Sequence, residues 1–297
     1  MMIFPSLDAF IRATINGLMM GCIFAIIAIG FQLVFGVVKL PQFAHGSVIV
    51  WGMYLTWYLV EKFGFDPFLS IIIVLPVFFF LGYLLQKLIF SHILDLEEMQ
   101  QMIFIFGLLI ASMYLAELVF SVDPRILGKD QYVEQPIVLG AFSFHRGLTI
   151  SAALSAIFIV GTSLFLNKSR LGVSIRACAD NRYGAQISGL HVRFLYATAV
   201  AIATLMAGAA GTMLMTFSVA APWRAMGLTI TAFMVIVLAG MGSYMGSFIG
   251  GLIYGVLVSW LQVSKFSTYS EAILYGLMIL FLLFKPAGLF GKLESGK

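Results

Sequence analysis

Long stretches without a charged side chain divide this sequence, and they restrict the possible folds more than any other feature. A helix needs about 20 apolar residues to cross the hydrocarbon core of a bilayer. Strict alternation of apolar and polar residues, the pattern of a membrane β-barrel, is absent from these stretches. The predicted membrane segments are therefore helices, and they lie within residues 13–38, 40–60, 67–86, 99–116, 147–167, 194–223, 225–264 and 272–284.

The stretch 225–264 is too long for a single crossing. It has about 40 residues and would extend about 60 Å as a helix, roughly twice the thickness of the core. It must fold back on itself, and Gly240-Met-Gly-Ser243 is the expected place. The chain is thus predicted to be an all-α polytopic membrane protein, a single transmembrane domain over residues 1–297. Eight or nine transmembrane segments are expected, and they include broken or re-entrant helices.

Composition excludes the main soluble classes. Hydrophobic residues make up 61% of the chain, charged residues make up 10%, and the mean hydropathy is +1.04. Soluble domains are about half apolar and about a quarter charged. The net charge of +4 is attributed to basic cytoplasmic loops, and no nucleic-acid partner is expected. Cys22 lies in an apolar stretch and Cys178 in a basic one, so neither a disulfide nor a metal site is predicted.

Basic residues in short loops predict the orientation, because such loops tend to stay in the cytoplasm. The segment 168–193 has one acid, Asp180, and its basic residues are Lys168, Arg170, Arg176, Arg182 and Arg193. The tail after Phe284 is also basic. If both are cytoplasmic, residues 86–101 lie inside as well, and the N-terminus and residues 121–146 lie outside. The first stretch lacks the basic region that begins a signal peptide, so it is expected to be retained as a membrane helix.

The residues between the first two predicted helices are unusually polar for membrane depth. Pro41 interrupts the chain there, and the polar side chains of the break at 36–47 are Lys39, Gln42, His45 and Ser47. Polar groups at this depth normally face a protein interior or a water-filled cavity. A second break rich in glycine lies at 220–246, and paired breaks in a transporter point to a binding site near the membrane midplane. A simple cytoplasmic turn with a polar tip is the competing interpretation.

The cytoplasmic segment 168–193 is the second candidate site. Residues 177–187 are predicted to form a short amphipathic helix that ends at Gly189. Such a helix suits docking on a partner protein, and it equally suits binding to an anionic membrane surface. The chain has no phosphate-binding Gly-x-x-x-x-Gly-Lys-Ser/Thr loop, so any ATP that drives this protein is hydrolysed by another chain.

Four ordered segments carry a family resemblance. The first is residues 17–30 followed by Phe43-Ala-His-Gly46, and the second lies in 168–193. The third is Val237-Leu-Ala-Gly-Met-Gly-Ser243, and the fourth is Lys285-Pro-Ala-Gly-Leu-Phe-Gly291. Together they resemble the branched-chain amino acid ABC transporter permeases, most closely the LivH-type branch. The chain departs from that family at Gln42, where asparagine is usual, and at Ser47, where an acid is frequent.

This resemblance implies a permease subunit of an ABC importer in the bacterial inner membrane, and not an enzyme. The implied solute is a branched-chain amino acid or a related small polar solute such as urea, an amide or another amino acid. The implied partners are a second related permease chain in a heterodimer, two cytoplasmic ATPases that hold ATP and Mg²⁺, and an extracytoplasmic binding protein. No cofactor or metal is expected in this chain, whose N-terminus would lie outside and whose C-terminus would lie in the cytoplasm.

The resemblance also implies two sets of site residues. The predicted solute pathway contains Gln42, Phe43, His45, Gly46 and Ser47. The predicted contact with the ATPase contains Leu171, Gly172, Arg176, Ala177, Asp180, Asn181, Ala185 and Gly189. The competing hypothesis is an ion- or proton-coupled secondary transporter or channel that uses Glu117 and His45. A membrane-embedded enzyme is disfavoured, because nucleophiles, bases and metal ligands do not cluster in the sequence.

Overall fold

The computed structural model describes residues 7–128, 136–139, 142–240 and 242–291. In this part, seven helices are long and apolar enough to cross a membrane. Five of them are the single helices α1 (Leu7–Val38), α5 (Glu98–Phe120), α6 (Arg146–Lys168), α9 (Val192–Met215) and α11 (Tyr244–Val263). The other two are longer than one helix: one begins with α3 (Ile71–Leu85) and one ends with α12 (Ser270–Phe284). Helices α2 (His45–Phe63) and α10 (Arg224–Ala239) complete the membrane part. The predicted all-α polytopic membrane fold is confirmed.

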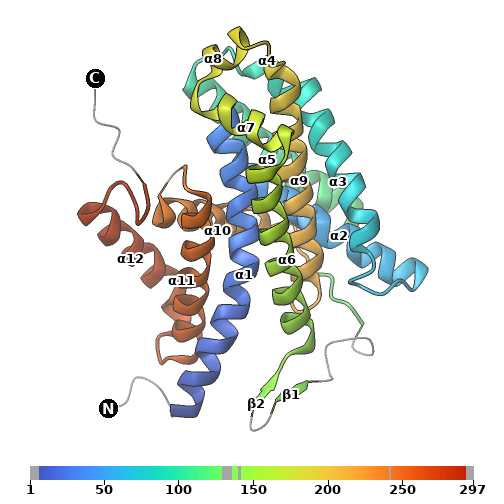
Figure 1. Ribbon diagram of the computed structural model, residues 1–297. Helices are drawn as coiled ribbons and strands as arrows, with labels where there is room; N and C mark the ends of the chain where they lie inside the picture. The colour runs from blue at the N-terminus through green and yellow to red at the C-terminus, as the bar shows by residue number, and fades with distance from the viewer. Residues whose placement is uncertain (1–6, 129–135, 140–141, 241, 292–297) are drawn as a thin grey trace.

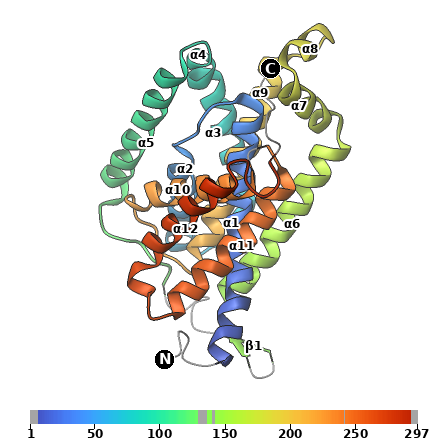
Figure 2. The ribbon, with the colours of Figure 1, turned by 90° about the vertical axis from the view of Figure 1, so that its left-hand side faces the viewer.

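Helices α1 and α9 form the centre of the molecule, and α5 and α12 form its edge. In the most apolar window of α1 and of α9, 83% of residues are buried, against 17% for α5 and 6% for the span that contains α12. Figure 2 shows α5 and α6 on opposite flanks of this centre. Helix α3 continues through a π-helical turn at Gln86–Phe90 into the short α4 (Ser91–Ile93), and a 3₁₀ turn at Ser267–Tyr269 precedes α12.

Glycine pairs bring α1 and α11 into close contact. A Cβ atom on Gly21 would lie 2.7 Å from the Cα atom of Leu252, and one on Gly251 would lie 2.6 Å from the Cα atom of Ala25. Neither position has room for a side chain, so the two backbones approach as closely as glycine permits. Helices α1 and α11 are therefore in direct backbone contact at both glycines.

The long stretch 225–264 folds back where the sequence predicts, between α10 and α11. Gly240 and Gly242 both have positive φ angles, +95° and +93°, which side chains rarely tolerate. The segment 285–291 packs onto this turn, since the Leu289 amide donates to the Leu238 carbonyl (2.9 Å). Two of the four family-like segments thus contact each other. Met241, which belongs to the predicted turn, lies outside the described residues.

The two ends of the helical body carry different segments (Figure 1). At one end lie α4, α7 (Arg170–Asp180) and α8 (Arg182–Ile187). At the other end lie the start of α1 and a small antiparallel hairpin of β1 (Ile137–Leu139) and β2 (Phe142–Phe144). Residues 86–101 and 168–193, both expected to be cytoplasmic, therefore share one end, and the start of α1 and the hairpin within 121–146 share the other.

Candidate functional site

The break between α1 and α2 returns the chain to the middle of the molecule. Helix α2 begins at His45, whose Nε2 donates to the Ile27 carbonyl of α1 (3.1 Å). Ile27 lies about three turns before the end of α1, or about 16 Å along its axis. The chain leaves α1 through Lys39, which has a positive φ of 56°, and then runs back alongside α1 toward its middle. Helix α2 therefore starts inside the molecule and not at its surface.

The start of α2 meets the start of α10, so the early and late breaks come together. The Gly46 amide donates to the Thr229 hydroxyl (3.0 Å), and the hydroxyl proton of Thr229 goes to the Phe43 carbonyl (2.8 Å) or the Ala225 carbonyl (3.0 Å). A Cβ atom on Gly46 would overlap the Ala225 carbonyl and lie 2.7 Å from the Thr229 amide nitrogen. Only glycine allows this contact between the two half-helices.

Three buried polar atoms of the break have no hydrogen-bond partner in the described residues. They are Gln42 Oε1, His45 Nδ1 and Ser47 Oγ, whose residues are only 1%, 0% and 3% exposed. Most buried polar groups are paired, because an unmade hydrogen bond leaves the full desolvation penalty. Since Nε2 of His45 carries the proton given to Ile27, its Nδ1 is an acceptor. The break thus presents unmet acceptors, with the Ser47 hydroxyl also able to donate.

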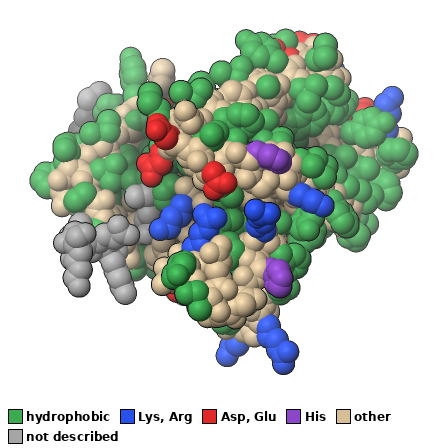
Figure 3. All heavy atoms as spheres, turned by 90° about the horizontal axis from the view of Figure 1, so that it is seen from above, with side chains coloured by type: hydrophobic (Ala, Val, Ile, Leu, Met, Phe, Trp, Pro, Cys, Tyr) green, Lys and Arg blue, Asp and Glu red, His purple; other side chains and the backbone are tan. Residues whose placement is uncertain are grey.

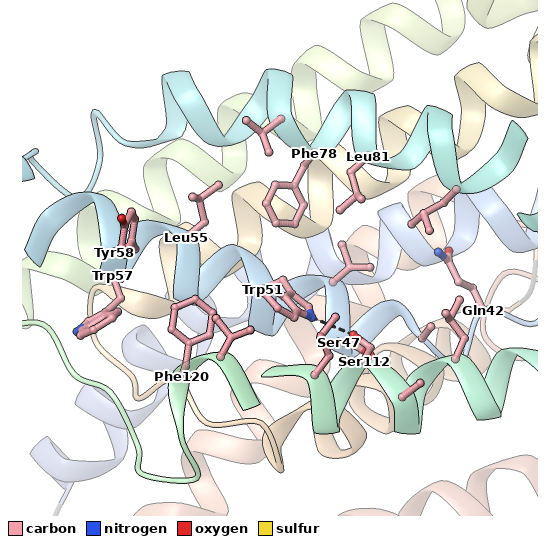
Figure 4. Close-up of a pocket in the computed structure, with 18 of the residues that line it drawn as sticks. Gln42, Ser47, Trp51, Leu55, Trp57, Tyr58, Phe78, Leu81, Ser112 and Phe120 are labelled. Carbon is pink, nitrogen blue, oxygen red and sulfur yellow. Dashed lines mark hydrogen bonds between the residues drawn. The ribbon is translucent and has the colours of Figure 1, made fainter. Parts of the chain in front are cut away.

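A cavity of about 890 Å³ runs along α2 between α3 and α5 (Figure 4). Its walls are mostly apolar. Ala44 lines it just before α2, and one face of α2 supplies Ser47, Val48, Trp51, Leu55, Tyr58 and Lys62. Gln42 lies at one end of this cavity with Ser47 nearby, and Trp57 and Tyr58 lie at the other end. The cavity has the size and apolar character of ligand sites, with a few polar groups at defined positions.

The far end of the cavity is aromatic. The rings of Tyr54 and Phe120 are stacked, with centroids 4.3 Å apart, and Phe120 also contacts Trp51 and Trp57 edge-on. Trp51 Nε1 donates to the Ser112 hydroxyl (2.9 Å), which fixes the indole against α5. This cluster lies outside both sets of predicted site residues. Its signal was the spacing of aromatic residues over 51–58, which places several rings along one side of a helix.

The predicted pathway residues divide into two groups. Gln42 and Ser47 line the cavity, whereas Phe43, His45 and Gly46 hold the break together through Thr229 and Ile27. Glu117, which the competing carrier hypothesis uses with His45, does not line this cavity, and neither does His45. In the described residues no group of three or more His, Cys, Asp or Glu side chains is placed to hold a metal ion.

The predicted coupling helix is wrong in its bounds: residues 170–187 form two helices. The Ser169 hydroxyl accepts from the Gly172 amide (2.9 Å) at the start of α7, and Asn181 Oδ1 accepts from the Gly184 amide (2.8 Å) at the start of α8. Asparagine is among the best N-cap residues, so the chain restarts at Asn181 instead of continuing one helix. Gly189 follows α8 with a positive φ of 80°, as a C-terminal cap does.

The predicted coupling residues also divide by exposure. Gly172 packs against Phe165 and Leu166 of α6, and Ala185 is buried, so both position the segment. The exposed members are Leu171, Arg176, Ala177, Asp180, Asn181 and Gly189. Figure 3 views this end of the molecule and shows basic side chains gathered across part of it. Tyr183 and Ile187 of α8 are 72% and 69% exposed, which is unusual for apolar groups outside the membrane helices.

Comparisons with known proteins agree on one family. The sequence model of the permease component of branched-chain amino acid transport systems matches residues 13–283. The high-affinity branched-chain amino acid transport permease BraD of Pseudomonas aeruginosa is 30% identical to this chain, over 99% of both chains. The corresponding LivH of Salmonella typhimurium is 27% identical over 97% of both. A probable LivH of Methanocaldococcus jannaschii is 26% identical over 90% of this chain and 88% of its own. No solved structure matches.

Proposed function

The chain belongs to the family of permease components of branched-chain amino acid transport systems, and from this premise we propose that it forms the solute pathway of an ABC importer. The proposed solute is a branched-chain amino acid or a related small solute. The observation that carries the proposal is the cavity along α2, whose lining includes the polar residues Gln42 and Ser47. Its apolar walls suit an aliphatic side chain, and its polar end suits the groups of an amino acid backbone.

The proposed assembly contains more than this chain. We place a second related permease beside it, two ATPases that hold ATP and Mg²⁺ below it, and an extracytoplasmic binding protein above it. The chain is one permease domain over residues 1–297 in the bacterial inner membrane, and 168–193 is its coupling segment. Closure of the ATPases would tilt α6 and α9 through α7 and α8, because Gly172 fixes α7 to the end of α6. The chemical step then belongs to the ATPases alone.

We expect removal of the unpaired polar atoms to impair transport without impairing folding. Gln42→Ala and Ser47→Ala each remove a buried group that has no partner in the described residues, so the folded yield should be unchanged or higher. If these groups bind the solute, each variant should raise the KM of leucine uptake by about 3- to 10-fold, the effect of one lost hydrogen bond. Uptake is measured in proteoliposomes with the assembled complex.

Ser259→Ala is the matched control for these variants. Ser259 is also 3% exposed but lies in α11, away from the cavity, where its hydroxyl contacts only the sulfur of Met20 in the described residues. It should leave the KM unchanged. Normal uptake kinetics in both Gln42→Ala and Ser47→Ala would remove this stretch from the solute pathway.

The proposed orientation places the N-terminus outside and both the coupling segment and the C-terminus in the cytoplasm. Labelling of Cys178 is unsuited to test this orientation, because the residue is only 1% exposed. Burial also raises the pKa of its thiol, and nearby Arg182 offsets only part of that rise. In a Cys22→Ala background, we expect an impermeant maleimide to label Val122→Cys in intact spheroplasts. Tyr183→Cys should be labelled only after permeabilisation. The side chains of Val122 and Tyr183 are both well exposed, but the proposed orientation places them on opposite sides of the membrane. Labelling of Tyr183→Cys in intact spheroplasts would reverse the topology.

A further inference from the structure

Arg125 is held in a fixed position at the aromatic end of the cavity. It follows α5 in the chain, and its backbone pairs with that of Ala220. The amide of each residue donates to the carbonyl of the other, at 2.8 Å in both cases. Its Nε and Nη2 atoms donate to the Phe120 carbonyl at 3.3 and 2.9 Å. The contacts to Phe120 and Ala220 tie one arginine to the end of α5 and to the segment before α10. Such a side chain loses little further freedom when it binds a ligand.

The guanidinium of Arg125 also lies over an aromatic ring and lines the cavity. Its Cζ atom is 5.1 Å from the centroid of the Trp57 ring, a cation–π arrangement. No carboxylate of the described residues forms an ion pair with it. Glu117 lies on α5 one turn before Phe120 and makes no ion pair with Arg125 in the described residues. The exposed carboxylate of Asp123 accepts a hydrogen bond from the Ser121 hydroxyl (3.2 Å). A half-buried, oriented guanidinium with no anionic partner among the described residues is suited to a carboxylate from outside the chain.

The surrounding walls define the rest of such a ligand. Trp51, Trp57, Tyr58 and Phe120 line the cavity beside Arg125 and offer apolar and aromatic surface. Planar aromatic faces favour burial of a hydrophobic side chain. A monocarboxylate with a bulky apolar part would place its charge at Arg125 and its side chain against these rings.

This end of the cavity is separate from the polar end. Along α2, Ser47 and Tyr58 are about three turns apart, or about 16 Å. A small amino acid is too short to contact both ends at once. Binding at Arg125 and binding at Gln42 and Ser47 are therefore successive events on one route.

We propose that Arg125 forms a distinct outer binding site that selects the carboxylate of an amphipathic monocarboxylic solute before it reaches Gln42 and Ser47. This inference rests on the proposed function, which supplies the solute pathway, and it adds the charge and shape of the solute. Arg125 acts here as a specificity-determining residue. Lys265 is an exposed positive charge that does not line the cavity, so it serves as the reference for Arg125 in the test.

The test compares two solutes that differ only in charge at the carboxyl carbon. Binding of radiolabelled leucine, and its displacement by leucinamide, is measured on the assembled complex in nanodiscs without the binding protein. Arg125→Gln should weaken leucine binding at least 10-fold and leave leucinamide within about 2-fold of wild type, because only leucine has the carboxylate. The leucine affinity of Arg125→Lys should lie between those of wild type and Arg125→Gln, since lysine keeps the charge but lacks the planar guanidinium. Lys265→Gln, which removes one positive charge from an exposed residue outside the cavity, should change neither by more than about 2-fold.

The outcomes separate this inference from the proposed function. If the wild-type complex binds no leucine and imports none when the binding protein is added, the proposed solute class is wrong, and the inference fails with it. If the wild-type complex binds leucine but Arg125→Gln affects leucine and leucinamide equally, Arg125 only supports the fold and the inference alone is overturned. Unchanged binding of leucine in Arg125→Gln overturns it too. Thermal denaturation of each variant reports whether the Phe120 contact was needed for stability.

Discussion

Replacing Gly46 with alanine is expected to abolish transport and to reduce the yield of folded protein severely. The new Cβ atom would overlap the Ala225 carbonyl and lie 2.7 Å from the Thr229 amide nitrogen, both of which belong to the first turns of α10. Forcing one carbon into a packed interior typically costs about 1–3 kcal/mol. Here it also separates the Gly46 amide from the Thr229 hydroxyl (3.0 Å) and so opens the junction of the two half-helices.

Gly107→Ala and Gly161→Ala provide matched controls for Gly46→Ala. Both glycines lie inside membrane helices, and nothing is within 4 Å of the position that their Cβ atoms would take. Alanine is the better helix former by about 1 kcal/mol, so these variants should be neutral or slightly stabilised. Detergent-extracted yield, thermal denaturation and leucine uptake are measured for all three. Equal behaviour of Gly46→Ala and the controls would show that the junction of α2 and α10 is not a rigid contact.

The double variant Tyr183→Glu, Ile187→Glu is expected to reduce co-purification of the ATPase more than 10-fold. Both side chains project from α8 into water, 72% and 69% exposed, at the end of the molecule that carries the basic segment. Exposed aromatic and aliphatic groups in such a place commonly carry most of the energy of a protein contact. Placing two carboxylates there would leave them buried without partners in the complex. The permease itself should fold normally, since neither side chain supports its core.

Gln186→Glu with Ser188→Glu is the control for this pair. Both residues are exposed, Gln186 in α8 and Ser188 directly after it, and the change adds a similar negative charge, so a purely electrostatic effect would appear here too. Retention of the ATPase within about 2-fold of wild type is expected for the control. If both double variants lose the ATPase alike, charge and not the apolar surface of α8 governs docking. If neither loses it, the ATPase binds elsewhere.

Much of the fold follows from the sequence because its determinants are local. The lengths of the uncharged stretches predict the membrane helices, and the excess length of 225–264 requires the turn that Gly240 and Gly242 form. The break at 36–47 follows from Pro41 and the polar residues beside it. Gly17 and Gly21 in α1, and Gly251 and Gly255 in α11, are four residues apart. Each pair places two small residues on one face of its helix, which favours the close packing observed.

Capping and burial in the coupling segment were harder to predict. The sequence indicates a helix that ends at Gly189, but the choice between one helix and two depended on whether the Asn181 side chain would cap the Gly184 amide. Gly172 and Ala185, two members of the predicted ATPase contact, pack within the chain. Exposure of a small residue is decided by its neighbours in space, and the sequence around it carries no sign of them.

The sequence by itself determined the helical nature of the membrane segments, the fold-back and the position of the break. Only the tertiary structure decided that the break meets α10, that Gln42 and Ser47 face a cavity, and that Arg125 lies at its other end. The contact between Gly46 and Thr229 joins residues 183 positions apart. Helix formation depends on residues within a few turns, whereas the pairing of a buried polar group depends on whichever distant residue reaches it. No such residue pairs with Gln42 Oε1 or Ser47 Oγ in the described chain, and only the packed structure shows this.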